Sequence, residues 1–408
     1  MKYQKLTIAL PTSTFLPSIG GVEVGLHNIA LNLSRSGHQP VVIAPATHIY
    51  QLRKLHLPLP YKLVALPPKT LTLANILPDI AIVILSNYFS LLQKRHNFDI
   101  WHGTVGYPVG VALARFGLNK FPHLIRCAGD DIQIDRKINY GMRINPRIDA
   151  LVQKWLPQAD AMVAITESIE REYENIGVPK AKILRIPNGV SLERFTKTQP
   201  SASLRKKYDL PQNAFLFLTV GRNHPKKGFK DLIRASSLLN ATTSRPFAVA
   251  IAGADTHSLT NLISQEGLTG KIFCLGEIGS SAQNVRHTNW PSEDLVDLYK
   301  TADAFVFPSH IESFGIALVE AMAAGLPVIT TDGPGCVDVV GNGAFGKLVP
   351  VGNPSSLAKA MQGFQEEKAL REQYISASQR RAKDFSWETV VAKYLTAYQT
   401  LITNSQTV

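Results

Sequence analysis

The chain has 408 residues, of which 45% are hydrophobic and 18% charged, and its formal net charge is +12. The composition excludes a disordered chain, and the length predicts two domains. The positive charge favours phosphorylated ligands or an anionic membrane surface as partners. We do not expect nucleic acid as a partner, because no run of lysine and arginine with interleaved aromatic residues stands out.

The cysteine pattern and the apolar segments bear on location. Cys127, Cys274 and Cys336 are widely spaced and odd in number, which indicates free thiols in a reducing compartment. The first apolar run fits a strand better than a secretion signal. The longest apolar stretch, 73–92, contains a proline and two polar residues, which favours a buried or surface-lying helix over a membrane span. We therefore expect a cytoplasmic protein, with peripheral contact at the inner face of an anionic membrane as a further hypothesis.

Residues 5–45 have the pattern of strand, loop, helix and strand, which implies a parallel sheet. The loop before the helix holds Gly20 and Gly21, which allow a phosphate to approach the backbone closely. The G-x-G-x-x-G fingerprint of dinucleotide sites is absent, and a flexible loop without a ligand fits the same residues. Residues 47–70 are predicted to be irregular, and residues 76–96 to form an apolar helix.

Strands and helices continue to alternate after this first unit. One predicted strand ends at His102, and the next ends close to Asp130. A basic segment, 135–147, follows, and we interpret it as a solvated loop, with a surface that contacts a membrane or a phosphate as the alternative. Residues 196–211 lose all apolar periodicity, and we place the domain boundary there.

Six further apolar runs, each followed by a helical pattern or a turn, form a second series. The predicted fold class is α/β, with two doubly wound, Rossmann-like domains at 1–195 and 196–385. The amphipathic segment 386–408 is expected to form a helix that packs back on the first domain. Ligands of open α/β sheets bind beyond the C-terminal ends of the strands. We expect the two domains to face each other across one cleft at those ends.

The most informative stretch, 308–328, places Glu312 and Glu320 eight residues apart around a short apolar helix. Ser313 is the expected N-cap, with the helix running from about Gly315 to Ala323. The backbone N–H groups at the helix start are then donors for an anion, while the carboxylates accept hydrogen bonds from hydroxyls. These donors belong to Phe314, Gly315 and Ile316. A nucleotide sugar suits such a site, and an ordinary strand–helix unit with solvated glutamates fits the same spacing.

A second cluster, Arg222 and Lys227, follows a predicted strand and is flanked by two glycines. Arginine offers a bidentate fork and lysine a point charge, and both can converge on one diphosphate from a loop. At roughly 4 Å, each charge pair contributes of order 4 kcal/mol before desolvation. That is the scale needed to hold a diphosphate leaving group and stabilise its developing charge. A solvated basic turn is the alternative interpretation.

Together these motifs resemble glycosyltransferase family 4, the large retaining family of GT-B fold. The resemblance covers most of the chain and is strongest from Asp160 to Trp387. The matching stretches are GGVE at 20–23, FDIWHG at 98–103, ADAMVAITES at 159–168, ILRIPNGVSLERF at 183–195, VGRNHPKKGF at 220–229, IAGAD at 251–255, AFVFPSHIESFGIALVEAMAAGLPVI at 304–329 and FSW at 385–387. The E-x7-E motif with its surrounding block is specific to the family.

The resemblance implies a hexosyltransferase that moves a sugar from a UDP-, GDP- or ADP-linked donor, with retention of the anomeric configuration. The acceptor would be a saccharide or a lipid-linked saccharide in glycan biosynthesis. No bound metal or other cofactor is implied, because Arg222 and Lys227 would bind the diphosphate in its place. Gly20 and Gly21 would border that diphosphate.

The same resemblance implies three roles for residues of the E-x7-E block. Glu312 would hold hydroxyls of the donor sugar, and Glu320 would hold the ribose of the nucleotide. The backbone of Phe314, Gly315 and Ile316 would face the donor phosphates or the sugar.

One departure from the family pattern concerns the acceptor side. The family commonly has H-G-x-D where this chain has Ala128 before Gly129 and Asp130. His102 matches a strand-end histidine of the family, and His102, Asp130 or Asp131 would orient the acceptor hydroxyl. A buried structural role for His102 is equally open. The substitution at Ala128 also leaves open a nucleotide-sugar-binding protein with lost or altered transfer chemistry, or an epimerase.

Overall fold

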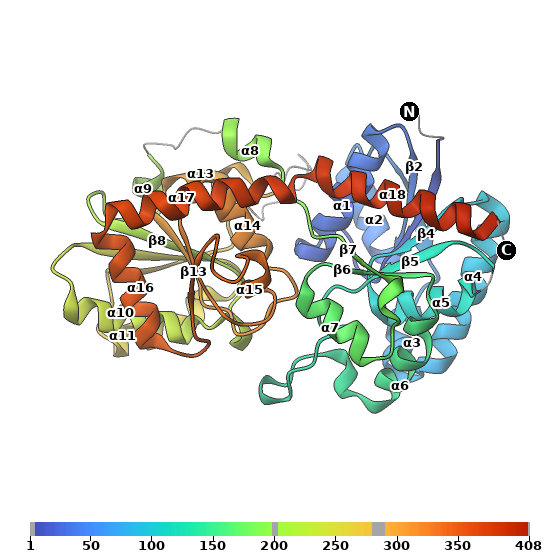
Figure 1. Ribbon diagram of the computed structural model, residues 1–408, viewed down its shortest axis with the longest axis horizontal. Coiled ribbons are helices and arrows are strands. Elements are labelled where there is room, and N and C mark those ends of the chain that lie inside the picture. Colours follow the sequence, from blue (N-terminus) through green and yellow to red (C-terminus); the bar gives the residue numbers. More distant parts are fainter. Residues whose placement is uncertain (1–4, 119, 198–202, 280–289, 407–408) are drawn as a thin grey trace. The chain divides into compact units, whose positions relative to one another are not determined.

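The computed structural model describes residues 5–118, 120–197, 203–279 and 290–406 (Figure 1). The described residues form two compact units. The first comprises those up to Gly189 together with those from Trp387 onward, and the second comprises those from Val190 to Ser386. The division lies six residues before the predicted boundary at 195, because Phe195 is fully buried and packs on Tyr299 of the second unit.

The first unit is a parallel sheet in the order β3-β2-β1-β4-β5-β6-β7, flanked by helices. Its strands are β1 (Thr7–Pro11), β2 (Gln39–Pro45), β3 (Lys62–Leu66), β4 (Ile100–Gly103), β5 (His123–Arg126), β6 (Ala161–Ala164) and β7 (Ile183–Arg185). Its helices are α1 (Gly21–Arg35), α2 (Ala46–Leu55), α3 (Thr70–Ile76), α4 (Pro78–His96), α5 (Val111–Gly117), α6 (Pro146–Trp155), α7 (Glu167–Asn175) and α18 (Trp387–Gln406).

The second unit is a parallel sheet in the order β10-β9-β8-β11-β12-β13. Its strands are β8 (Phe215–Val220), β9 (Phe247–Ala252), β10 (Ile272–Gly276), β11 (Ala304–Phe307), β12 (Val328–Thr331) and β13 (Lys347–Val349). Its helices are α8 (Leu192–Lys197), α9 (Leu204–Lys207), α10 (Phe229–Thr242), α11 (Thr260–Gln265), α13 (Glu293–Thr301), α14 (Ile316–Ala323), α15 (Cys336–Val339), α16 (Pro354–Glu366) and α17 (Lys368–Ala382).

The two parallel sheets confirm the α/β class and the doubly wound architecture of each half. Central strands such as β4, β9 and β11 are buried throughout, because helices cover both faces of a parallel sheet. The prediction that residues 47–70 are irregular is wrong, since α2 and β3 occupy much of that segment. β3 is an edge strand that is mostly half exposed or exposed, so it lacks the continuous apolar run of a central strand.

The C-terminal helix α18 contacts α1 within the first unit. Trp387 begins this helix, and a Cβ atom on Gly189 would lie 2.3 Å from its indole ring. Only glycine leaves room for the ring at that point, which ties the Asn188-Gly189 turn to the start of α18. In the described part of the chain, no helix is long and apolar enough to cross a membrane.

Each sheet has one point where the strand order reverses direction. In the first unit this point lies between β1 and β4, and in the second it lies between β8 and β11. The loops that follow these two pairs of strands diverge there and leave a crevice for ligands. Most of the predicted site residues occur in these loops or at the helix starts that follow them.

Candidate active site

In the second unit, the loops after β8 and β11 are held in direct contact. Gly228 adopts a left-handed conformation with φ +65°, and a Cβ atom there would lie 2.0 Å from the carbonyl oxygen of Pro308. The backbone N–H of His310 donates to the carbonyl oxygen of Lys226 at 2.7 Å. The His310 ring also contacts Oδ2 of Asp231 through Nε2 at 2.6 Å. These contacts fix the basic loop against the E-x7-E block.

Glu312 and Lys227 form an ion pair across this junction. Nζ of Lys227 lies 2.5 Å from Oε1 of Glu312, and both side chains are largely buried. The hydroxyl of Ser309 donates to the same carboxylate oxygen at 3.1 Å. Burial alone would raise the pKa of Glu312, but the charges of Lys227 and Lys226 and the two hydrogen bonds lower it below its ordinary value. Glu312 is therefore an ionised acceptor beside a cation.

Arg222 differs from Lys227 in its surroundings. Its side chain is exposed, and it makes no hydrogen bond or ion pair with the described part of the chain. The Lys227 side chain is only 16% exposed, with its ammonium group 5.0 Å from the centroid of the Phe307 ring. The loop after β8 therefore offers one positioned cation and one cation that is available to an incoming anion.

The start of α14 is shaped by Gly315 and not by Ser313. Gly315 is the N-cap residue, with φ +91° and no side-chain cap, so the predicted cap by Ser313 is wrong. The left-handed conformation favours glycine because a Cβ atom would be strained there. The backbone N–H groups of Phe314, Gly315 and Ile316 have no acceptor among the described residues. They are available donors at a helix start, as the sequence predicted.

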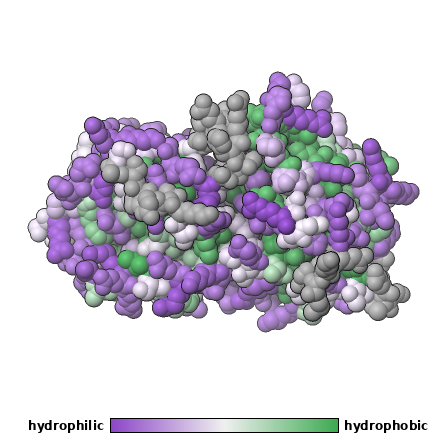
Figure 2. Space-filling model, turned by 90° about the horizontal axis from the view of Figure 1, so that it is seen from above, coloured by the Kyte–Doolittle hydropathy of each residue, from purple (hydrophilic) through white to green (hydrophobic). Residues whose placement is uncertain are grey.

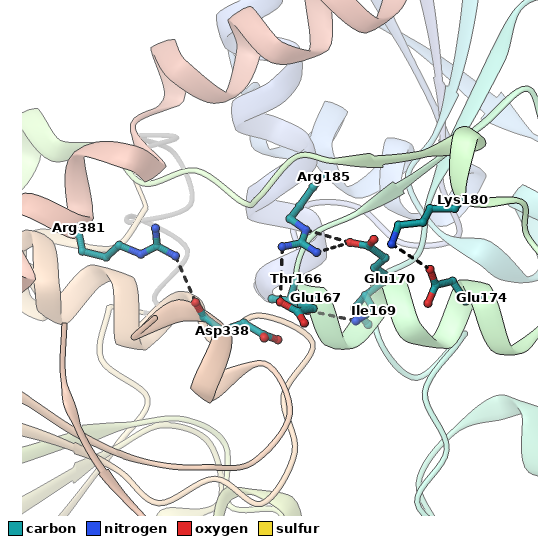
Figure 3. A network of polar contacts seen from close by, with 9 residues as sticks. All are labelled: Thr166, Glu167, Ile169, Glu170, Glu174, Lys180, Arg185, Asp338 and Arg381. Atoms are coloured by element: carbon teal, nitrogen blue, oxygen red, sulfur yellow. Dashed lines mark hydrogen bonds and ion pairs between the residues drawn. The ribbon is translucent and has the colours of Figure 1, made fainter. Parts of the chain in front are cut away.

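Phe314 is held in place by aromatic packing within the same unit. Its ring meets that of Phe385 edge-on, with centroids 5.4 Å apart. The guanidinium of Arg381 lies 4.7 Å from the Phe385 centroid and donates to the carbonyl oxygen of Asp338 at 3.2 Å (Figure 3). The FSW stretch thus supports the helix start through Phe385.

Glu320 lies on α14, where it contacts Tyr299 and is near the charge of Arg194, two residues that the sequence did not single out for it. The hydroxyl of Tyr299 donates to Oε2 of Glu320 at 2.9 Å. Burial raises the pKa of Glu320 to about 7, although the Tyr299 hydrogen bond and the nearby charge of Arg194 act in the opposite direction. Arg194 itself pairs with Glu293, with 2.7 Å between Nη2 and Oε1. Arg194 lies in the matching stretch 183–195, but no spacing rule connects it or Tyr299 to Glu320.

In the first unit, Gly20 and Gly21 mark the start of α1 after β1. Gly20 is the N-cap with extended backbone, and a Cβ atom there would lie 2.7 Å from Oε2 of Glu23. The hydroxyl of Thr14 donates to the other oxygen of Glu23 at 2.5 Å. Gly20 thus leaves room for the Glu23 carboxylate, which ties the loop to the helix.

His102 is the penultimate residue of β4, at the same switch point, but its side chain is fully enclosed. Its Nδ1 contacts the hydroxyl of Tyr398 on α18 at 2.7 Å, and its ring lies 4.7 Å from that of Tyr394. Burial and, secondarily, the charge of Arg126 lower the pKa of His102 to about 3. The ring is therefore neutral near pH 7 and has no exposed edge for a substrate, which favours the structural alternative for this residue.

The loop after β5 separates two neighbouring carboxylates. Asp130 is exposed, whereas Asp131 is buried and accepts hydrogen bonds from the backbone N–H groups of Gly106, Ala128 and Gly129. Burial, with a smaller contribution from Asp130, raises the pKa of Asp131 to about 6 despite these bonds. Asp131 shapes the loop, and Asp130 is the carboxylate that is exposed to solvent.

Another matching stretch, ADAMVAITES, proves to be a structural element. Thr166 caps α7 by accepting a hydrogen bond from the N–H of Ile169 at 3.4 Å. Arg185 on β7 reaches Glu167 and Glu170 on the first turn of that helix (Figure 3). The stretch therefore stabilises a helix start, and its polar side chains bind other residues of the protein.

The structure gathers the predicted donor residues of the second unit at one point, the switch between β8 and β11. These are Arg222, Lys227, Glu312, Phe314, Gly315 and Ile316, with Glu320 further along α14. In the first unit, Gly20, Gly21 and His102 gather at the switch between β1 and β4, and Asp130 follows the next strand. Among the described residues, no group of three or more His, Cys, Asp or Glu side chains is arranged to hold a metal ion.

Two family models match the chain, one over each half. Residues 19–194 match the model described as Glycosyltransferase Family 4, and residues 201–381 match the model described as Glycosyl transferases group 1. The chain belongs to glycosyltransferase family 4. This family 4 chain is 30% identical, over 66% of its length, to the D-inositol 3-phosphate glycosyltransferase of Streptomyces avermitilis. The match spans 56% of that relative, slightly more than half of its length.

Other relatives match this family 4 chain nearly end to end. The N-acetyl-alpha-D-glucosaminyl L-malate synthase of Bacillus anthracis is 22% identical, over 94% of this chain and 95% of its own. A glycosyltransferase structure from Rickettsia africae superposes with a TM-score of 0.77 at 22% identity, covering 98% of this chain and 100% of its own. Anabaena HepE in complex with UDP gives a TM-score of 0.74 at 20% identity, covering 97% and 100%. The two-domain GT-B fold is thereby confirmed.

Proposed function

We propose that the protein is a retaining glycosyltransferase that moves a sugar from a nucleotide-diphosphate sugar to a saccharide or lipid-linked acceptor. The observation that carries the proposal is the buried pair of Lys227 and Glu312 beside the available N–H donors at the start of α14. In this arrangement, cations and backbone dipoles can bind a diphosphate. A carboxylate a few residues away can accept hydrogen bonds from sugar hydroxyls. The UDP complexes of HepE support a nucleotide-linked donor.

In the proposed reaction, Arg222, Lys227 and the α14 donors hold the diphosphate and stabilise its charge as the sugar leaves. Glu312 binds donor-sugar hydroxyls and Glu320 binds the ribose. The bond between the anomeric carbon and the diphosphate oxygen breaks, and a bond to the acceptor oxygen forms on the same face. The acceptor proton passes to the departing diphosphate oxygen, so the protein needs no histidine at Ala128. The proposed cationic role of Arg222 and Lys227 replaces that of a metal ion.

A thermal-shift screen against UDP-, GDP- and ADP-sugars tests donor binding, followed by transfer assays with a panel of saccharide and lipid-linked acceptors. We expect one nucleotide class to stabilise the fold and Glu320→Ala to weaken that effect. Transfer in at least one pairing supports the proposal. Donor binding with neither transfer nor hydrolysis in any pairing contradicts it.

Ala128 motivates a second candidate, a nucleotide-sugar-binding protein with lost transfer chemistry. The family histidine is absent, and the backbone N–H of Ala128 is held by Asp131 at 2.9 Å. This candidate predicts that Ala128→His leaves transfer at zero while Glu320→Ala still weakens nucleotide binding. An epimerase would instead isomerise its donor with no acceptor present.

The net charge of +12 motivates one further part of the proposal. We place the protein in the cytoplasm, in peripheral contact with an anionic membrane that presents the acceptor. Salt-sensitive association with anionic vesicles is the expected result.

A further inference from the structure

Helix α4 carries an apolar stripe on its outward face. Ile80 and Ile84 are four residues apart, and Leu91 follows Ile84 by seven residues. These spacings place the three side chains on one side of the helix. They are 51%, 37% and 60% exposed. The opposite side of α4, including Leu85 and Phe89, is buried in the first unit. A surface helix normally has polar residues on its outward side, whereas this side of α4 has the three apolar residues and, between Ile84 and Leu91, the exposed Asn87. The described chain leaves this mostly apolar side uncovered.

Apolar residues extend the stripe to the end of α3, and two basic residues lie at the opposite end of α4. Ile76, at the end of α3, and Leu77, just before α4, are also exposed. At the other end of α4, Lys94 and Arg95 are exposed in the last turn. The space-filling view shows how hydrophobic residues (green) gather in patches among hydrophilic ones on one face of the molecule (Figure 2).

A pocket of about 380 Å³ lies beside the stripe, between α4, α5 and α6. Val83, itself exposed, belongs to its lining and connects it to the stripe. The cations Arg115, Arg147 and Lys154 also line it, against the single carboxylate of Asp79. None of the three cations forms an ion pair with the described residues. The pocket is thus a cationic recess at the border of an apolar surface.

An aromatic ring lies in the same pocket. Trp155 is half buried, with Lys154 5.3 Å and Arg115 5.9 Å from its ring centroid. Tryptophan is enriched where a protein meets the boundary between lipid and water, because its ring is apolar and its N–H polar. The surface therefore combines the apolar stripe, the amphipathic ring of Trp155 and the cations of the pocket.

We propose that this surface, called here the α4 surface and formed by Ile80, Val83, Ile84, Leu91 and the cationic pocket, docks the protein on an anionic membrane. The apolar residues would enter the boundary between headgroups and acyl chains, and the pocket would receive lipid phosphates. Charge complementarity selects this occupant over a second copy of the chain, since two copies would each bring a net charge of +12. The proposal rests on the membrane contact proposed above and names the surface that would make it, and it does not depend on donor binding by the second unit.

Flotation with vesicles tests the proposal on the full chain. Wild-type protein should float with vesicles of equal parts phosphatidylglycerol and phosphatidylcholine, and not with phosphatidylcholine alone. Each lysine or arginine near such a surface contributes about 1 kcal/mol, or roughly a fivefold change in partitioning. Arg147→Gln with Lys154→Gln should therefore reduce the partition coefficient roughly 25-fold. Ile80→Ser with Ile84→Ser should reduce binding even at low salt.

Matched controls come from exposed positions of the second unit. Leu238→Ser with Val351→Ser removes two exposed apolar side chains, and Lys347→Gln with Lys359→Gln removes two exposed cations. Both control proteins should float like wild type. All variants should retain the melting temperature and the nucleotide-sugar thermal shift of wild type, which separates this proposal from the proposed function.

Three results overturn the proposal. One is wild-type protein that does not float with the anionic vesicles. Another is a loss of flotation that is equal in the α4-surface variants and the control variants. The third is self-association in sedimentation experiments that Ile80→Ser with Ile84→Ser abolishes, because the stripe would then be a contact between copies.

Discussion

The hydroxyl of Tyr299 donates a hydrogen bond to Oε2 of Glu320 at 2.9 Å, from α13 to α14. Tyr299 is fully buried, and its ring packs on Phe195 and Phe305 with centroids 5.9 and 5.7 Å away. The tyrosine has no freedom to follow the carboxylate, so the hydrogen bond fixes one oxygen of Glu320 and leaves the other for a ligand. Tyr299 thus positions the proposed ribose-binding group.

Tyr299→Phe is expected to weaken nucleotide binding by roughly three- to tenfold, the range for one net hydrogen bond. The variant keeps the ring packing and loses the hydrogen bond to Glu320, together with the longer one, 3.3 Å, to the carbonyl oxygen of Ala317. Isothermal titration with the nucleotide identified by the thermal-shift screen measures the effect. Tyr374→Phe is the control, because the Tyr374 hydroxyl has no hydrogen bond in the described residues. Equal affinities for the two variants would show that Tyr299 does not position Glu320.

The protonation of Glu320 predicts a pH dependence with two components. Its pKa is raised from 4.5 to about 7 in the folded protein. Between these values the folded state holds a proton that the unfolded state has lost, so the free energy of unfolding falls as pH rises from about 4.5 to 7. The loss is at most about 3 kcal/mol. Ionised Glu320 is also the stronger hydrogen-bond acceptor, so nucleotide affinity should rise through pH 7.

Glu320→Gln separates the two components. Chemical denaturation at pH 5 and pH 8 should show the variant gaining stability relative to wild type at the higher pH, while its nucleotide affinity is low at both. A variant whose stability relative to wild type does not change with pH would rule out a raised pKa at this position.

The ion pair of Lys227 and Glu312 predicts a large loss of stability when only one partner is removed. Lys227→Met leaves the buried Glu312 carboxylate without its cation, which costs about 3–5 kcal/mol. Adding Glu312→Gln removes the stranded charge, so the double variant should regain most of that stability while donor binding stays lost. Urea denaturation of both single variants and the double variant provides the cycle. The exposed Lys230, changed to Met, is the control, and a purely additive double variant contradicts the pairing.

The sequence predicted the fold well because its central strands are continuous apolar runs. β8, β9 and β11 have that pattern, and Gly221, Gly253 and Pro308 directly after them mark the loops. The edge strand β3 is partly exposed and carries a weaker pattern, so periodicity missed it. Chain order also indicated that the Arg222 loop and the Glu312 block follow strands, and strand order then brings them together.

The parts that could not be predicted depend on contacts between distant segments. Tyr299 is 21 residues from Glu320, and Tyr398 is 296 residues from His102. Neither tyrosine has a local sequence signature. A tyrosine whose hydroxyl orients another side chain occurs at the same sequence positions as a tyrosine that only packs in the core. The misplaced cap at Ser313 has a different cause, since both Ser313 and Gly315 are plausible caps and the left-handed turn selects the glycine.

The enclosed ring of His102 yields the last prediction, which concerns acid stability. Its pKa is lowered from 6.5 to about 3, so the unfolded chain binds a proton below pH 6.5 that the folded protein excludes. The contribution to stability is therefore fully present above pH 6.5 and is lost as pH falls, by up to about 4–5 kcal/mol near pH 3. His102→Asn can still contact the Tyr398 hydroxyl but cannot titrate, so it should lose less stability than wild type between pH 7 and pH 4. His56→Asn, at an exposed left-handed position that asparagine tolerates, is the control. An acid response of His102→Asn identical to that of wild type, measured by denaturation at both pH values, would show that this ring does not stay neutral in the fold.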